Sequence, residues 1–300
     1  MKLCNTTGAF SLHFNNEIDK LKELHASGFR YVDFSMYSNQ TRAFMHDNWK
    51  EDIKKIKETA DELGLTFVQA HSPAFETLET LDPNESWDEK YKETIRSIEI
   101  CKELSIPMTV IHAGVKRNTS KEETLELNKK FYASLFPVME ETGVNVLVEN
   151  VGAQDNEGRY YLNDGYRLKE FVEYVDHPLI HACWDIGHGN AMMSDQYNDI
   201  MALGEHLYAI HYNDNNAKDD EHRIPFLGKV NQKRTMQALI DVKFKGPFTF
   251  EADGGLKSKL LGFDKMLNNK DLSLDVIRAE QKLLFEMGKY LLNSFGIYEE

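Results

Sequence analysis

Short apolar segments alternate with longer amphipathic segments along the whole 300-residue chain, and few folds accommodate such alternation. The short segments have the length and composition of β-strands, and the longer ones carry apolar residues at helical spacing. Repeated strand–helix units favour a parallel sheet with helices packed on it. The eight predicted strands are Lys2–Thr7, Tyr31–Met36, Thr66–His71, Met108–His112, Val144–Glu149, His181–Asp185, Leu207–Tyr212 and Phe248–Glu251.

The segments between the strands predict helices, and glycines follow three of them at the position that favours left-handed backbone, Gly28, Gly64 and Gly143. A doubly wound sheet shows the same alternation, but eight strands rather than six favour closure into a barrel. We therefore predict an α/β fold, a (β/α)8 TIM barrel. The main predicted helices are Asn16–Ser27, Lys50–Leu63, Ser86–Leu104, Lys121–Thr142 and Leu274–Leu292.

The chain shows no linker or composition break, so we expect one domain over residues 1–300. The barrel is expected to span about residues 1–252, because about 250 residues suffice for eight βα units. The remaining residues, about 253–300, form a predicted helical extension. This extension is a candidate lid or a candidate contact between copies of the chain in a homo-oligomer.

Composition excludes several classes of protein. No segment is apolar for long enough to cross a bilayer, and the N-terminus lacks a signal-peptide pattern, so we expect a cytoplasmic protein without membrane contact. Three widely spaced cysteines argue against a disulfide framework or a thiolate zinc site and are expected to be buried apolar residues. The formal net charge of -14 disfavours nucleic acid as a partner, because counterion release needs a dense basic surface.

Residues able to bind a metal stand at the ends of six predicted strands. The C-terminal strand ends of a parallel barrel converge on one face, and that face carries the active site. Six residues far apart in sequence are therefore expected to be neighbours in space. They are His71, His112, Glu149, Asp185, His211 and Glu251.

Imidazole and carboxylate ligands without thiolate suit a divalent ion such as Zn, Mn, Fe or Co. Three buried carboxylates at one mouth need compensating positive charge, and no predicted strand ends in Lys or Arg. A metal supplies that charge, although hydrogen-bonded residues without an ion are the alternative. His188, Asp220 and His222 lie just beyond strand ends, the last two in a long loop, and are possible additional metal or substrate ligands.

With these residues in hand, the chain resembles the xylose-isomerase-like TIM-barrel superfamily, in particular its sugar phosphate isomerase/epimerase group. The resemblance covers about residues 1–252. It rests on the order and spacing of Val-Glu149-Asn, Trp-Asp185-Ile-Gly-His188, His211-Tyr-Asn-Asp, Asp220-Glu-His222-Arg-Ile-Pro-Phe-Leu-Gly228 and Phe-Glu251-Ala-Asp.

The ketose 3-epimerase branch of that superfamily implies one metal held by Glu149, Asp185, His211 and Glu251, with both glutamates also acting as acid and base. It implies that His188 contacts a substrate hydroxyl, and we expect a second substrate contact from Arg223. The expected cofactor is a divalent metal, Mn, Zn, Co or Mg. The apurinic endonuclease branch implies three zinc ions, for which this chain has all the candidates: His71, His112, Glu149, Asp185, His188, His211, Asp220, His222 and Glu251.

The leading hypothesis is a metal-dependent isomerase or epimerase acting on a small sugar or sugar phosphate through an enediolate. The alternatives are a multinuclear phosphoester hydrolase of apurinic-endonuclease type, a lyase such as an inosose dehydratase, and a non-catalytic sugar-binding barrel. Two features depart from ketose epimerases. Ketose epimerases have a second glutamate a short interval after the first metal-binding glutamate, and this chain has no clear counterpart of it after Glu149. They also have an Asp-Trp after the loop glycine, where this chain has Lys-Val-Asn-Gln after Gly228. The identity of the substrate is therefore left open.

Overall fold

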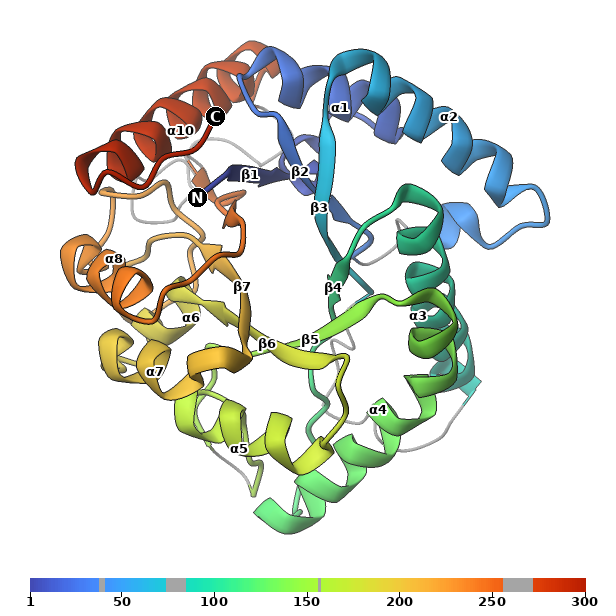
Figure 1. Ribbon diagram of the computed structural model, residues 1–300, viewed down its shortest axis with the longest axis vertical. Helices are drawn as coiled ribbons and strands as arrows, with labels where there is room; N and C mark the ends of the chain where they lie inside the picture. The colour runs from blue at the N-terminus through green and yellow to red at the C-terminus, as the bar shows by residue number, and fades with distance from the viewer. Residues whose placement is uncertain (38–40, 74–84, 156–157, 256–271) are drawn as a thin grey trace.

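Eight parallel strands close into a barrel in which β1 to β8 follow one another in chain order and β8 pairs with β1. The computed structural model describes residues 1–37, 41–73, 85–155, 158–255 and 272–300, with only the backbone of residues 85–87. The helices surround the barrel (Figure 1). The predicted (β/α)8 barrel is thus confirmed. Its strands are β1 Leu3–Thr6, β2 Tyr31–Ser35, β3 Thr66–His71, β4 Met108–Val110, β5 Asn145–Glu149, β6 Ile180–Asp185, β7 Leu207–Tyr212 and β8 Phe248–Phe250.

The described helices match the predicted amphipathic segments closely. Side chains of Asn16 and Ser120 cap α1 and α4 by accepting hydrogen bonds from the backbone N–H groups three residues later. Gly64 and Gly143 end α2 and α4 in left-handed backbone, as predicted. The helices are η1 Thr7–Phe10, α1 Glu17–Ala26, η2 Thr41–Phe44, α2 Trp49–Leu63, α3 Glu85–Leu104, α4 Lys121–Thr142, α5 Gly165–Val175, α6 Ile186–Ala191, α7 Gln196–Leu203, η3 Gly204–His206, α8 Gln232–Asp241 and α10 Leu274–Ser294.

Two predicted strand ends are longer than the structure shows. β4 stops at Val110 and β8 at Phe250, so His112 and Glu251 lie one or two residues beyond regular pairing. Local irregularity therefore carries these two side chains into the mouth of the barrel. The other strand ends agree with the prediction to within one residue.

Side chains fill the interior of the barrel. A small apolar cluster inside the ring joins Val110, Leu147, Cys183 and Ala209, one from each of four neighbouring strands. All three cysteines are free and buried, as predicted. This apolar layer supports the C-terminal ends of the strands from below, which limits the movement of the polar residues that follow it.

Helix α10 confirms the helical pattern predicted for the tail, but it packs beside β1 on the outside of the barrel rather than over the mouth (Figure 1). A Cβ at Gly288 would contact Phe250 and Leu3, so the absence of a side chain lets the helix approach the strands closely. Residues 256–271 of the predicted extension lie outside the described residues.

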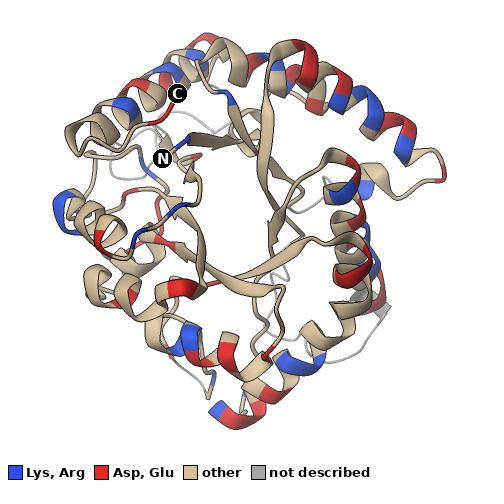
Figure 2. Cartoon of the chain, viewed as in Figure 1, with Lys and Arg blue, Asp and Glu red and all other residues tan. Residues whose placement is uncertain are grey.

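Charged residues lie mainly on the outer helices, and the strands carry few of them (Figure 2). The acidic net charge is thus spread around the outside of the ring. Within the described ranges, no helix combines the length and the apolar composition needed to cross a bilayer.

Candidate metal centre

Four of the predicted ligands meet at the C-terminal ends of β5 to β8. Parallel pairing sets Asp185 beside His211 on neighbouring strands. Nδ1 of His211 lies 3.0 Å from Oε1 of Glu149 and 2.9 Å from Oε2 of Glu251. One ligand atom from each of the four residues lies within 4.8 Å of the others. We call these four residues the central group.

Two further groups flank the central group. His71, His112 and Glu149 form the β3–β4 group, in which Nε2 of His112 lies 3.1 Å from Nε2 of His71 and 3.0 Å from Oε2 of Glu149. Glu149 therefore belongs to two groups, one through each carboxylate oxygen. The sequence-predicted candidates of both groups come together in the structure.

The third group, which we call the loop group, consists of His188, Asp220 and His222. Oδ2 of Asp220 lies 3.2 Å from Nε2 of His188 and 3.0 Å from Nε2 of His222. The long loop after β7 thus brings Asp220 and His222 close to His188 on α6, the helix that follows β6. All nine metal candidates named from the sequence lie in these three groups.

The histidine rings are oriented by hydrogen bonds from the nitrogen that faces away from each group. Nδ1 of His71, His188 and His222 lies within 2.7 to 2.9 Å of the backbone carbonyls of Ser72, Asn150 and Glu251, respectively. A carbonyl only accepts, so Nδ1 carries the hydrogen and Nε2 is directed at the group. Such fixing of the tautomer is typical of metal-binding histidines. The buried Oε2 of Glu149 faces Nε2 of His112 at 3.0 Å and Nε2 of His71 at 3.5 Å, an arrangement that fits a ligand oxygen.

Asp185 is held by asparagines on both neighbouring strands. The side chain of Asn150, next to Glu149, accepts from the Asp185 backbone N–H at 2.6 Å and donates to its carbonyl at 3.0 Å. Nδ2 of Asn213 donates to Oδ2 of Asp185 at 2.9 Å. A Cβ at Gly187 would overlap the Asn213 side chain, so glycine is needed for this close approach.

Gln69 is a functional candidate that the sequence analysis missed. Its side-chain amide lies 2.7 Å from Nε2 of His211 and 3.3 Å from Oδ1 of the buried Asp33. Nε2 of His211 is therefore engaged inside the barrel while Nδ1 faces the central group. A signal was present in the sequence, because Gln69 is two residues before His71 and side chains alternate along a strand.

Burial and charge act against each other throughout the site. Burial raises the pKa of Glu149, but His211 and His112 outweigh it and hold the pKa well below its ordinary value. Glu251 behaves similarly and has a pKa of about 2, chiefly because of His211. Burial raises the pKa of Asp185 to about 6. The two glutamates are therefore ionised at neutral pH.

A cavity of about 660 Å³ opens over the three groups at the barrel mouth. Most of its described lining residues carry polar side chains, and no Lys or Arg occurs among them. The volume accommodates a small sugar. It is lined by Thr6, Gly8, Ser11, Ser35, Tyr37, His71, His112, His188, Asp220, His222, Glu251 and Asp253.

Arg223, predicted to contact substrate, has its guanidinium engaged within its own loop. It donates to Oε1 of Glu221 at 2.6 Å and to the carbonyl of Leu227 at 2.9 Å, and the residue is 4% exposed. Arg223 is not among the described residues that line the mouth cavity. Its geometry fits a role in shaping the loop, and its substrate contact stays a prediction.

The fold and the site together define a parallel (β/α)8 barrel with a candidate metal centre at its C-terminal mouth. The family model for xylose isomerase-like TIM barrels matches residues 21–268, and the chain belongs to this family.

Known proteins resemble this chain over most of its length. A protein named "Probable endonuclease 4" from Sulfurihydrogenibium sp. is 24% identical over 250 residues, which cover 77% of this chain and 85% of that protein. A crystal structure of D-psicose 3-epimerase, determined in the presence of D-fructose, superimposes with a TM-score of 0.75 at 13% identity, covering 97% of this chain and 99% of the other. That of 3-keto-D-glucoside 4-epimerase from E. coli gives 0.69 at 16% identity, covering 96% and 99%. At these identities the structural likeness establishes the fold.

Proposed function

We propose that this protein is a divalent-metal-dependent isomerase or epimerase of a small sugar or sugar phosphate. The observation that carries the proposal is the pair of carboxylates, Glu149 and Glu251, which converge on Nδ1 of His211 beneath a cavity of sugar size. The structural likeness to sugar epimerases supports the same class of reaction.

The residues of the central group fit a divalent ion, with Glu149, Asp185, His211 and Glu251 as its ligands. When bound, the ion would act as a Lewis acid that stabilises negative charge on the oxygens of an enediolate. Proton transfer and the positioning of the substrate are carried out by side chains of this protein.

Glu251 is the proton acceptor in this proposal, because its side chain is 26% exposed and lines the mouth cavity. Its carboxylate is ionised at neutral pH and can take a proton from the carbon next to the substrate carbonyl. Glu149 is fully buried, contacts the same Nδ1 of His211 as Glu251 does, and is the second acid and base in this proposal. His188 lines the cavity and orients a substrate hydroxyl.

The test is loss of proton exchange in glutamine variants. Glu149→Gln and Glu251→Gln should each reduce turnover by about 10²- to 10⁴-fold, because a positioned carboxylate contributes about that much. Exchange of substrate C–H in deuterated solvent is measured over a panel of sugars and sugar phosphates, with Glu170→Gln on the exposed face of α5 as the matched control. Near-full exchange by Glu251→Gln would refute its role.

A second candidate is phosphoester hydrolysis at a multinuclear site, favoured by the β3–β4 group and the loop group. Together with the central group they offer ligands for up to three ions, and paired ions suit the displacement of an oxygen at phosphorus. The likeness to an endonuclease 4 points the same way.

Metal content separates the two candidates. Elemental analysis of purified protein that gives about one ion per chain favours the isomerase, and two or three ions favour the hydrolase. Incubation with DNA containing an abasic site completes the comparison, since cleavage together with absent sugar exchange would replace the first proposal by the second.

A further inference from the structure

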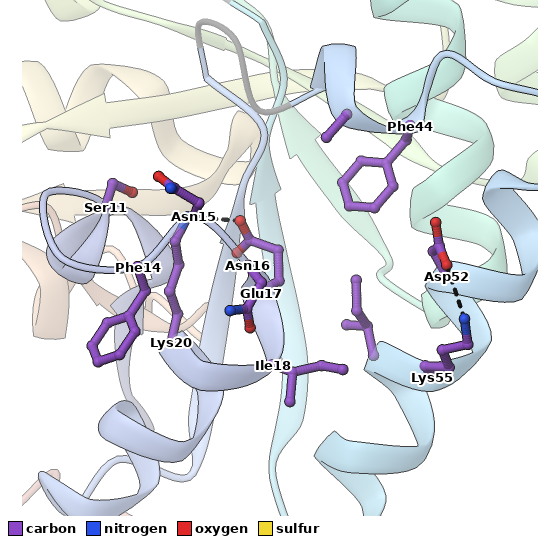
Figure 3. A pocket seen from close by; sticks show the side chains of 12 residues that line it. Ser11, Phe14, Asn15, Asn16, Glu17, Ile18, Lys20, Phe44, Asp52 and Lys55 are labelled. Carbon is purple, nitrogen blue, oxygen red and sulfur yellow. Dashed lines mark hydrogen bonds and ion pairs between the residues drawn. The ribbon is translucent and has the colours of Figure 1, made fainter.

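A second cavity lies on the outside of the barrel, between the start of α1 and the first turns of α2 (Figure 3). Its volume is about 440 Å³, within the range of small-molecule sites. We call it the α1–α2 cavity. It shares only Ser11 with the described lining of the mouth cavity, so it is a separate site.

A buried ion pair forms one wall of this cavity. Nζ of Lys20 lies 2.7 Å from Oε1 of Glu17, and the two side chains are only 2% and 6% exposed. Burying two charges is expensive unless their hydrogen-bonding capacity is used. Burial raises the pKa of the Glu17 carboxyl, against the opposing effects of Lys20 and of a side-chain hydrogen bond from Thr7, so its hydrogen-bonding capacity is only partly used. Nζ of Lys20 donates to Oε1 of Glu17. The pair therefore offers an acceptor and donors side by side.

The remaining walls of the α1–α2 cavity combine apolar side chains with polar ones that include Ser11, Asn15 and Asn16. Phe14 and Ile18 come from the α1 side, and Phe44 on η2 lies across from them (Figure 3). Ile56 on α2 also lines the cavity. A mostly apolar concavity with a few converging polar groups is the usual construction of a small-molecule site. An exposed ion pair between Asp52 and Lys55 stands at the rim.

We propose that the α1–α2 cavity binds a small neutral polyhydroxy compound, a monosaccharide or a polyol. One hydroxyl donates to Oε2 of Glu17, a neighbouring hydroxyl accepts from Nζ of Lys20, and the carbon face packs on Phe14 and Phe44. Neutrality follows because Glu17 and Lys20 already balance each other, and a charged ligand would bring an uncompensated charge into the buried wall.

This inference does not depend on the proposed reaction, because the α1–α2 cavity contains none of the metal candidates. The Glu251→Gln variant should therefore bind the polyol in this cavity as well as the unaltered protein does. Failure of the reaction and failure of this second site are thus distinguished.

The binding test uses the methyl groups of Ile18 and Ile56, which line the cavity, in NMR spectra of the full chain. D-fructose and D-sorbitol should each produce saturable shifts of both signals. The double variant Glu17→Gln/Lys20→Met should bind about 10- to 100-fold more weakly, because it removes charge-assisted hydrogen bonds. Lys22→Met, which removes an exposed lysine paired with Asp19 outside the cavity, is the matched control and should bind normally.

A second variant keeps the test decisive if the double variant folds poorly. Ala43→Phe places a ring in the cavity from an exposed position on η2 and leaves the ion pair intact, and it should abolish the shifts. Three results would overturn the proposal: no saturable shift up to about 100 mM, far above a Kd of about 1 mM; unchanged affinity in both cavity variants; or a response to L-leucine with none to the polyols.

Discussion

Replacing Asp214 by alanine should destabilise the loop that carries Asp220 and His222. Asp214 is fully buried, and its Oδ1 accepts hydrogen bonds from the backbone N–H groups of Asn215 at 2.8 Å and Val230 at 2.9 Å. Its Oδ2 accepts from the Phe226 N–H at 3.1 Å and from the Gln232 side chain at 3.0 Å. One carboxylate thus ties together the two ends and the middle of the segment 213–230.

The magnitude follows from the two donors that water reaches least. Asn215 and Val230 are buried, whereas Phe226 is 41% exposed and can be hydrated. Leaving a buried donor unsatisfied costs about 1 to 3 kcal/mol, so Asp214→Ala should lower the free energy of unfolding by about 2 to 6 kcal/mol. For a chain of this size that corresponds to a fall in Tm of about 4 to 12 °C.

Thermal unfolding and amide hydrogen exchange measure this effect together. We expect lower Tm and faster exchange at the amides of Asn215, Phe226 and Val230. Asp219→Ala is the control, because Asp219 lies in the same loop, is exposed and accepts only from the Asn216 side chain among the described residues. A Tm within about 1 °C of the unaltered protein, with those three amides still protected, would refute the reasoning.

Three further predictions concern the metal centre. Burial lowers the pKa of His188, but neighbouring carboxylates outweigh it and raise it to about 10, so an ion must displace a proton there below that pH. Burial lowers the pKa of His222 in the same group as well, but Asp220 and Asp253 outweigh it and raise the pKa well above its ordinary value, so a second proton is displaced. The apparent affinity of the ion for the loop group should therefore rise about 10- to 100-fold per pH unit from about pH 6 to 9, and a pH-independent Kd in calorimetry would contradict this. Gly187→Ala should displace the Asn213 side chain and weaken metal binding about 10- to 100-fold. Equilibrium dialysis measures the Kd, and an unaltered value would contradict this prediction. Gln69→Leu removes the hydrogen bond to Nε2 of His211 and should weaken binding at the central group by a similar factor, whereas a purely structural role would lower Tm and leave the Kd unchanged.

The strand ends were predictable because apolar runs of four to six residues stop where a polar residue follows, and parallel strands bring such stops together. Six of the nine metal candidates needed only this rule, and His188, Asp220 and His222 were named from their positions just beyond strand ends. Asn150 and Gln69 carried weaker signals, because adjacency to Glu149 or a shared strand face does not reveal a hydrogen-bond partner. The partner of Asn150 becomes visible only when β5 and β6 are in register, and that of Gln69 only when the barrel closes and brings β3 opposite β7.

Loop residues could not be placed from the sequence, since loops have no periodicity. Nothing in the sequence shows that Arg223 turns toward Glu221 rather than the cavity. Glu17 and Lys20 likewise have the spacing of an ordinary exposed helical ion pair. Their burial depends on how η1, η2 and α2 surround the start of α1, which is a matter of tertiary packing.

The position of Glu149 makes the two halves of the ring chemically unequal. The half that begins at β5 supplies every donor of the central group, from four consecutive strand ends. Among the described residues, the half that ends with β4 and its following residues supplies two imidazoles, His71 and His112, to the metal groups. The β3–β4 group is completed by a carboxylate oxygen of Glu149 from the other half. A fragment containing only the second half would keep a full set of four donors, whereas the first half alone would have none of the carboxylates.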